Sequence, residues 1–350
     1  MGWVRSVLQR EKKIKQDDNV AGRGNREGLF NVYRSFPVKK YGKMKRGIGQ
    51  GISSKVFLYE SNDMVYAVKC FVKKNLKDVD DMNAIGKEVE IHKGVDDGYH
   101  VVRLVESFRV RHEQFCVVLE YLPCTLQALY TTYGPMLDQA DRLCYFKQVA
   151  EGLYYLQSNG IGHRDIKLEN CGIDPQGDLK LFDFGSATMG NVGYGMAGSP
   201  SYAAPEIHAQ LMYDSFKCDV WSLGILLINL FYVSKQKWKN ARHDDKAFIS
   251  YRRHPTLENA VVSVRRIAND QDPQYVANKS PVDSLILQLL TVNVDHRIDL
   301  SELVNNHLWF QQIDCCRDRR GAGHAHLKAV ARMTAAASSA PSLSPCSEVS

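Results

Sequence analysis

The pattern of apolar and polar positions changes character twice along the chain. Residues 1–40 carry no sustained period and contain several glycines, so we predict a poorly ordered arm. From about residue 41, short runs rich in Val, Phe and Tyr alternate with turn residues, which is typical of β-strands. One helical stretch interrupts them, because apolar positions recur at intervals of three and four between residues 82 and 92. We expect strands at 55–59, 65–72, 101–110 and 114–120.

Helical periods dominate after Pro123. The apolar stripe from Leu143 to Leu156 predicts a helix that ends at Asn159-Gly160, a common C-terminal stop. Further on, we expect a strand pair at 172–173 and 179–183, helices at 220–233 and 283–290, and a disordered Ala/Ser-rich tail at 311–350. The pattern therefore predicts a small β-rich lobe followed by a larger, mainly helical one.

Composition is that of a soluble globular protein, with 350 residues of which 44% are apolar and 24% charged. The most apolar stretch, 220–233, is shorter than the roughly 20 residues of a bilayer span, so we interpret it as a buried helix. No apolar stretch follows Met1, which argues against a secretory signal. The nine cysteines include no C-x-x-C pair, so we expect reduced thiols inside the cell, in the cytoplasm or alternatively the nucleus. Cys315-Cys316 and His324-Ala325-His326 are interpreted as inert residues of the tail.

Charge is spread unevenly. Residues 1–46 hold 13 Lys/Arg against 4 Asp/Glu, whereas residues 47–310 hold 27 against 32. A basic arm thus precedes a mildly acidic body, which argues against a nucleic-acid-binding core. Met1-Gly2 fits a myristoylation pattern, but Trp3 disfavours it, so we favour a solvated arm over a membrane contact.

The first candidate chemistry lies between two expected strands, at Ile48-Gly49-Gln50-Gly51-Ile52-Ser53-Ser54-Lys55-Val56. Glycines at 49 and 51 let the backbone approach a phosphate chain, because no Cβ intervenes. Such glycine hairpins are also common without any ligand, so the motif alone is weak.

A lysine follows on the next expected strand. Strand alternation places Ala67 and Lys69 on one face, so an ammonium can reach phosphates while the small alanine leaves room for a flat base. Taken alone, Lys69 is as well explained as a surface lysine. Its carboxylate partner would come from the helical stretch, where Glu88 and Glu90 point about 200° apart. Glu88 flanks the apolar face, so we favour Glu88.

The strongest signal is His163-Arg164-Asp165-Ile166-Lys167-Leu168-Glu169-Asn170. Asp183-Phe184-Gly185, Ala204-Pro205-Glu206 and Asp219-Val220-Trp221-Ser222 follow it in order. These motifs resemble the eukaryotic-type protein kinase family, and the resemblance runs from about Tyr41 to Phe310. It implies a two-lobed kinase fold of the α+β class, with Mg-ATP in the cleft. The N-lobe at 41–122 would have about five antiparallel strands and one helix, and the C-lobe at 123–310 would be larger and mainly helical.

The resemblance assigns catalytic roles to Asp165, Lys167 and Lys69. Asp165 would accept the proton of the attacking hydroxyl, and Lys167 would neutralise charge on the transferred phosphoryl group. Asn170 and Asp183 would bind Mg²⁺, which prefers oxygen ligands.

The resemblance also implies an ATP site. Lys69 would hold the α- and β-phosphates and would itself be held by Glu88. Leu119 would be the gatekeeper, before a hinge in which the Glu120 carbonyl and the Leu122 amide face adenine. The residues implied to contact ATP are Ile48, Gly49, Gln50, Gly51, Ile52, Ser53, Ser54, Lys55, Val56, Ala67, Lys69, Glu88, Glu120 and Leu122.

Two sequence features indicate which amino acid accepts the phosphoryl group. Lysine two places after Asp165 and the run Gly198-Ser199-Pro200-Ser201-Tyr202 resemble serine/threonine kinases, so we expect protein substrates with Ser or Thr acceptors. The resemblance also implies that Ser199 can bond Asp165 and Lys167. The alternative is a catalytically weak pseudokinase scaffold that binds nucleotide and partner proteins. Such scaffolds usually lose one of the residues Lys69, Asp165, Asn170 and Asp183, and all four are present.

Two expectations concern structure and control. Glu206 and Arg297 match a buried structural ion pair of the family. Arg164 matches an arginine that can pair with a phosphate on the activation segment, where Thr188 and Tyr194 are the candidate acceptors. The segment has no Lys or Arg of its own, so we favour activity without phosphorylation.

Overall fold

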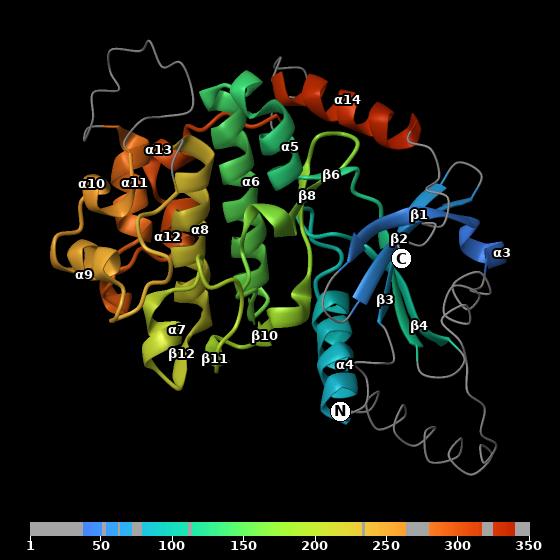
Figure 1. Cartoon of the computed structure of the whole chain (residues 1–350), viewed down its shortest axis with the longest axis horizontal. Coiled ribbons are helices and arrows are strands. Elements are labelled where there is room, and N and C mark those ends of the chain that lie inside the picture. The colour runs from blue at the N-terminus through green and yellow to red at the C-terminus, as the bar shows by residue number, and fades with distance from the viewer. Residues whose placement is uncertain are drawn as a thin grey trace, which may run out of the picture. The chain divides into compact units, whose positions relative to one another are not determined.

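The computed structural model describes residues 38–50, 54–61, 64–71, 79–110, 114–232, 235–263, 280–316 and 325–339 (Figure 1). The chain divides into two compact units. The smaller contains the described residues up to Glu90 together with Leu104–Tyr121, and the larger contains Ile91–Arg103 and everything from Leu122 to the last described residue. The predicted arm at 1–40 lies almost entirely outside the described residues.

The smaller unit is built on one antiparallel sheet with the strand order β1-β2-β3-β5-β4. Runs of β-branched and aromatic residues form four of its strands, as the sequence predicts, whereas the first strand has Ile48 as its one β-branched residue and no aromatic residue. The strands are β1 (Lys43–Gln50), β2 (Ser54–Ser61), β3 (Met64–Phe71), β4 (Leu104–Val110) and β5 (Gln114–Glu120), and the helices are α3 (Val38–Tyr41) and α4 (Val79–Lys93).

The two faces of this sheet bury different clusters. Val68 and Cys70 pack with Tyr41 and Tyr59 on one face. Phe71 packs with Ile85 and Val89 of α4 on the other face. Alternate residues of β3 therefore serve opposite faces, and Lys69 shares the face that carries α4.

The larger unit is mainly helical, and its core surrounds α6 and α8, which lie side by side (Figure 1). Its helices are α5 (Leu126–Tyr133), α6 (Gln139–Ser158), α7 (Pro205–Ala209), α8 (Ser215–Phe231), α9 (Lys246–Arg253), α10 (Leu257–Ala260), α11 (Pro281–Leu289), α12 (Leu300–Asn305), α13 (Leu308–Gln311) and α14 (Ala325–Ser339). Its strands are β6 (Cys124–Thr125), β7 (Ile161–Gly162), β8 (Cys171–Ile173), β9 (Leu179–Leu181), β10 (Thr188–Met189), β11 (Val192–Tyr194) and β12 (Met212–Asp214). Single 3₁₀ turns are η2 (Gly134–Met136), η3 (Leu168–Asn170), η4 (Phe184–Ser186) and η5 (Val294–His296).

Aspartates cap the N-termini of α6 and α8, at the points where a turn gives way to the apolar stripe of the helix. Asp138 caps α6 and forms a capping box with Asp141, and α6 ends before Asn159 and the left-handed Gly160. Asp214 caps α8 by accepting the N–H groups of Phe216 and Lys217. These caps satisfy amides that the first helical turn leaves unpaired.

Several expected elements need correction. The strand expected over 101–110 begins only at Leu104, because the backbone of residues 100–102 pairs instead with Leu181 in the larger unit. The strand expected to reach Asp183 ends at Leu181, since Asp183 adopts a left-handed conformation. The family-based lobe boundary after residue 122 also shifts by one residue.

The expected disorder of 311–350 is wrong for part of that segment. Residues 325–339 form α14, which lies beside α5 and buries His326, Ala329 and Val330 in the larger unit (Figure 1). The physical reason is an apolar stripe within an alanine-rich sequence that favours helix. Of the described helices, none is long and apolar enough to cross a membrane.

The cysteines that the structure describes are all buried, and none of them forms a disulfide. Cys346 lies outside the described residues.

Candidate active site

The glycine-containing segment begins at the end of β1. Gly49 pairs with Val56, and Gln50 with Lys55, across the β1–β2 ladder. A Cβ added at Gly49 would make only ordinary contacts with Val56, at 3.5 Å, so packing alone does not require glycine there. Ile48 lies within β1 and Ser54 is buried at the start of β2. Gly51, Ile52 and Ser53 lie outside the described residues.

Lys69 and Glu88 form the predicted ion pair. The Lys69 Nζ lies 2.6 Å from Glu88 Oε1, and the two side chains are 15% and 14% exposed. The ammonium also lies over the Phe71 ring, 5.1 Å from its centroid. Glu90 is exposed, so the choice of Glu88 over Glu90 is confirmed.

The residues expected around adenine occupy neighbouring strands and the segment after them. Ala67 is buried and pairs with Leu58 on one side and with Leu119 on the other. Glu120 ends β5. Leu122 belongs to the larger unit, where Gly172 leaves it room: a Cβ at Gly172 would lie 2.2 Å from Leu122 Cδ1.

Asp165 is held at both carboxylate oxygens within the larger unit. Oδ1 accepts the Ser199 backbone N–H at 2.8 Å. Oδ2 accepts Lys167 Nζ at 2.7 Å and Asn170 Nδ2 at 2.9 Å. These bonds fix the orientation of the carboxylate, which is a requirement for a group that positions a reacting hydroxyl.

Asp219 organises the backbone beneath the catalytic loop. Its carboxylate accepts the N–H groups of His163 at 2.8 Å and Arg164 at 2.7 Å. Burial raises the pKa of Asp219 to about 7, although these two N–H bonds act in the opposite direction. Arg164 has φ of 63°, a left-handed conformation that is costly for a non-glycine residue and that Asp219 holds in place.

His163 supports the same loop from within the core. Its Nδ1 accepts the Asp165 N–H at 3.3 Å, which leaves Nε2 to donate to the Phe182 carbonyl at 3.2 Å. Burial lowers the pKa of His163, in keeping with this neutral tautomer.

Asn170 and Asp183 offer oxygen donors to a hard cation. Asn170 uses its Nδ2 atom for the Asp165 carbonyl and carboxylate, so its Oδ1 is the atom suited to a metal. Asp183 has φ of 68°, and its neighbour Phe184 packs against the rings of His92 and His163. An amide oxygen and a carboxylate are donors that suit Mg²⁺.

The activation segment contacts the catalytic loop at Gly198 and Ser199. Ser199 Oγ accepts Lys167 Nζ at 2.8 Å. Gly198 has φ of 78°, and a Cβ there would lie 2.1 Å from the Arg164 carbonyl oxygen, so only glycine fits. The expected contacts of Ser199 with Asp165 and Lys167 are confirmed.

Arg164 is occupied by the activation segment itself. Its Nε donates to the Ser186 carbonyl at 2.6 Å, and its Nη1 donates to the Tyr194 carbonyl and the Tyr213 hydroxyl, each at 3.1 Å. Thr188 is only 6% exposed, whereas Tyr194 is 62% exposed. The segment is therefore anchored to Arg164 without a phosphate.

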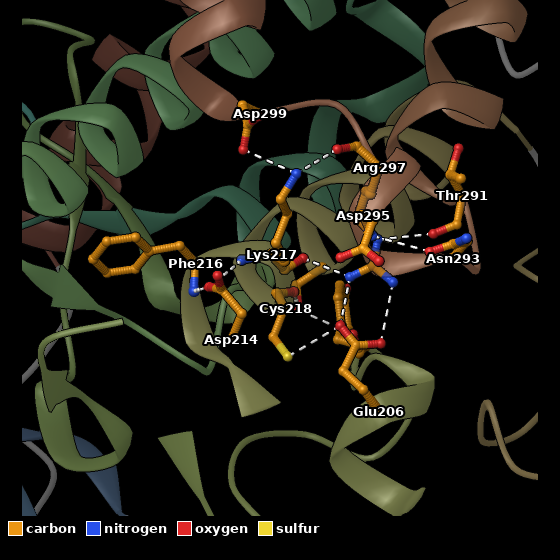
Figure 2. A network of polar contacts seen from close by, with 12 residues as sticks. Glu206, Asp214, Phe216, Lys217, Cys218, Thr291, Asn293, Asp295, Arg297 and Asp299 are labelled. Carbon is orange, nitrogen blue, oxygen red and sulfur yellow. Dashed lines mark hydrogen bonds and ion pairs between the residues drawn. The ribbon is translucent and has the colours of Figure 1, made fainter. Parts of the chain in front are cut away.

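The predicted pair Glu206–Arg297 forms the centre of a polar network (Figure 2). The guanidinium binds both carboxylate oxygens, at 2.6 and 3.1 Å, and the side chains of Arg297 and Glu206 are 0% and 3% exposed. Arg297 also donates to the carbonyls of Thr291 and Lys217, and Lys217 reaches Asp299. The network ties α7 and α8 to the segment after α11.

Two supporting residues were missed from the sequence. Asp219 was noted only as the start of a helix motif, although a lone aspartate in an apolar helix is a signal for a buried acceptor. Tyr213, which donates to the Gly195 carbonyl and accepts Arg164, offered no comparable signal.

Comparison with known proteins gives a consistent result. The model of the protein kinase domain family matches residues 43–310. A probable serine/threonine-protein kinase RTK1 from Saccharomyces cerevisiae is 28% identical over 296 residues, 80% of this chain and 46% of that protein. NUAK family SNF1-like kinase 2 from Rattus norvegicus is 34% identical over 189 residues, 53% of this chain and 30% of that protein. Serine/threonine-protein kinase HAL4/SAT4 from Saccharomyces cerevisiae is 23% identical over 335 residues, 89% of this chain and 53% of that protein. The chain thus spans about half the length of these relatives, or less.

Proposed function

Because the chain belongs to the protein kinase family, and its relatives are serine/threonine kinases, we propose that it transfers the γ-phosphoryl group of Mg-ATP to serine and threonine hydroxyls of proteins. The observation that carries this proposal is the fixed Asp165 carboxylate, held by Ser199, Lys167 and Asn170. A scaffold without turnover has no need for a carboxylate oriented by three donors.

The transfer needs little covalent chemistry from the protein. The acceptor oxygen forms a bond to the γ-phosphorus, the bond from that phosphorus to the β,γ-bridging oxygen breaks, and ADP leaves. Asp165 orients the acceptor hydroxyl and receives its proton. Lys167, whose ammonium lies 2.7 Å from Asp165 Oδ2, offsets the negative charge spread over the transferred group.

In the smaller unit, Lys69, oriented by Glu88, would place an ammonium on the phosphates of the nucleotide. Gly49, which has no Cβ, would let the backbone approach those phosphates. Asn170 and Asp183 would hold Mg²⁺, which when bound neutralises charge on the β- and γ-phosphates.

The acceptor class is argued from Lys167 and Ser199. Their 2.8 Å hydrogen bond joins the catalytic loop to the segment that would bind the substrate peptide. Both residues match the serine/threonine pattern of the sequence. We expect Ser and Thr acceptors rather than Tyr.

The test combines a substrate survey with one variant. Purified protein, Mg-ATP and a degenerate Ser/Thr/Tyr peptide library are incubated, and products are identified by mass spectrometry. Asp165→Asn should lower turnover at least about a hundredfold while nucleotide affinity, measured by fluorescence titration, changes little. Asp244→Asn, on an exposed surface, is the matched control.

Three results would contradict the proposal. Phosphotyrosine as the main product would contradict the acceptor class. Loss of nucleotide binding together with activity in Asp165→Asn would contradict the role of Asp165. A folded wild-type protein that binds ATP but phosphorylates no peptide or protein would support the scaffold alternative.

A further inference from the structure

Three cysteines far apart in sequence bring their sulfur atoms together in the larger unit. Cys144 lies on α6, and Cys315 and Cys316 follow α13. The Cys144 Sγ is 3.6 Å from Cys315 Sγ and 3.5 Å from Cys316 Sγ. All three are buried, and their sulfur atoms lie within 4.8 Å of one another. Within the part of the chain that the structure describes, this is the one group of three or more ligand-type side chains that could hold a single ion.

The spacing suits a tetrahedral metal. Zinc binds thiolates at about 2.3 Å, which places two sulfurs of a tetrahedral site about 3.8 Å apart. The distances from Cys144 Sγ to the other two sulfurs, 3.6 and 3.5 Å, are close to this value, so a metal needs only small side-chain adjustments. A disulfide would use two of the sulfurs and leave the third unexplained.

The amides around the cluster all direct hydrogens at sulfur. Gln148 Nε2 donates to Cys144 Sγ at 3.3 Å and to Cys316 Sγ at 3.6 Å. The Cys316 backbone N–H donates to Cys144 Sγ at 3.4 Å. Such N–H donors stabilise thiolates over thiols and commonly surround metal-bound sulfur.

The orientation of the Gln148 amide is fixed from its other end. Gln148 Oε1 accepts the Leu179 backbone N–H at 2.8 Å. The oxygen is therefore committed to β9, and the nitrogen must face the sulfurs. This arrangement is a second shell already in place for a thiolate centre.

We propose that Cys144, Cys315 and Cys316 bind one Zn²⁺ through three thiolates, with a water molecule as the fourth ligand. Cys316 is 7% exposed, so solvent can reach the edge of the cluster. Binding converts three thiols to thiolates, so one Zn²⁺ replaces three protons and the centre carries one negative charge. The ion joins the segment after α13 to α6, away from the Asp165 network, and it does not depend on the proposed kinase activity.

The experiment measures zinc binding directly. Full-length protein is reduced, freed of metal with a chelator and equilibrated with Zn²⁺ in competition with a chromophoric chelator. We expect one zinc per chain, about three protons released, and thiolate-to-metal charge-transfer absorption when Co²⁺ replaces Zn²⁺.

Variants assign the ligands. Cys316→Ser and Cys315→Ser should each weaken zinc binding at least about a hundredfold, and Gln148→Glu, which keeps the oxygen for Leu179, should weaken it about 10–100-fold. Cys116→Ala is the matched control, because Cys116 and Cys70 form a close buried pair, 3.2 Å apart, without a third ligand. It should retain one zinc per chain.

Any of four results would overturn the proposal. In the first, wild-type protein loses all zinc to the competing chelator, and in the second it binds Cu⁺ but not Zn²⁺. In the third, the variants Cys315→Ser and Cys316→Ser bind zinc as tightly as wild type. In the fourth, a disulfide forms between Cys144 and either Cys315 or Cys316 in reduced preparations. Circular dichroism on each variant establishes that a lost site is not a lost fold.

Discussion

Two ion pairs, one in each unit, use similar partners in opposite ways. The Lys69 Nζ lies 2.6 Å from Glu88 Oε1, and each side chain keeps about a seventh of its surface exposed. Arg297 and Glu206 meet through two contacts, are almost fully buried, and involve two backbone carbonyls as well. The first pair stays partly exposed to solvent, whereas the second is enclosed by protein.

The difference shows how to separate catalytic from structural charge in one molecule. A buried pair with every donor committed to protein serves stability, because breaking it leaves a charge without solvent. A partly exposed pair contributes little to folding but can orient a cation toward a ligand. The two kinds of ion pair differ in how much of the side chains is exposed to solvent and in how many donors are bound by protein acceptors, and not in residue type.

The largest effect should come from breaking the enclosed pair. Arg297→Met leaves the Glu206 carboxylate buried and uncompensated, and should lower the free energy of unfolding by about 3–5 kcal/mol. Denaturant unfolding measures the change. Arg242→Met, in an exposed pair with Asp244, is the control and should cost less than about 1 kcal/mol. Equal losses in the two variants would remove the distinction between enclosed and exposed pairs.

The partly exposed pair, Lys69 and Glu88, should show the converse behaviour. Lys69→Met should lower phosphoryl transfer at least about a hundredfold, or about 2.7 kcal/mol, while circular dichroism and unfolding stay close to wild type. Lys45→Met, in an exposed pair on β1, should leave the rate unchanged. Turnover near wild type in folded Lys69→Met would refute the catalytic role.

Asp219 is a buried carboxylate that accepts hydrogen bonds from two backbone N–H groups rather than from a charged partner. It therefore extends the comparison of the two ion pairs to a buried acid without a cation. Asp219 has a pKa of about 7 in the folded chain, raised by burial, against about 3.9 when unfolded. Between these values the folded state binds a proton that the unfolded state releases. Its contribution to stability is therefore present below about pH 4 and is lost as the pH rises toward 7.

The measurement compares unfolding free energies at pH 5 and pH 7.5. Wild type should lose about 2.5 kcal/mol relative to Asp219→Asn over this interval. His163, whose pKa burial lowers, acts in the opposite direction but is present in both proteins, so the difference isolates Asp219. Parallel pH profiles would show that Asp219 does not titrate in this range.

The smallest effect concerns a third cation, Arg164, whose hydrogen bonds run to carbonyls and a hydroxyl of its own chain. Because these contacts already anchor the activation segment, phosphatase treatment should change the initial rate by less than about twofold. Tyr194→Phe should behave like wild type. A drop of tenfold or more, restored by preincubation with ATP, would instead make Arg164 a phosphate receptor.

Local patterns predicted much of the fold and site, because they report on local geometry. Alternation placed Lys69 on the face of β3 that carries α4, and helical angles selected Glu88 over Glu90. The family resemblance anticipated Glu206–Arg297 and the contacts of Ser199 with Lys167 and Asp165. The ATP contacts and metal ligands remain predictions.

What the sequence did not show depends on contacts between distant segments. Cys144 lies 171 residues before Cys315, so no spacing rule connects them. Residues 100–102 do not extend the expected strand, because their backbone forms hydrogen bonds with the backbone of Leu181 instead. The helical tail was missed because an alanine-rich segment looks unstructured until a surface exists for it to cover.

The burial of His326 against Asp141 has a consequence for synthesis on the ribosome. The two residues are 185 positions apart, and both side chains are fully buried. At about 5–20 residues per second, translation reaches His326 roughly 10–40 seconds after Asp141. For that interval the Asp141 carboxylate has no imidazole partner, and the core positions of Ala329 and Val330 stay empty. The nascent larger unit therefore completes its core only after α14 has been made, and until then it presents to chaperones the surface that α14 later covers.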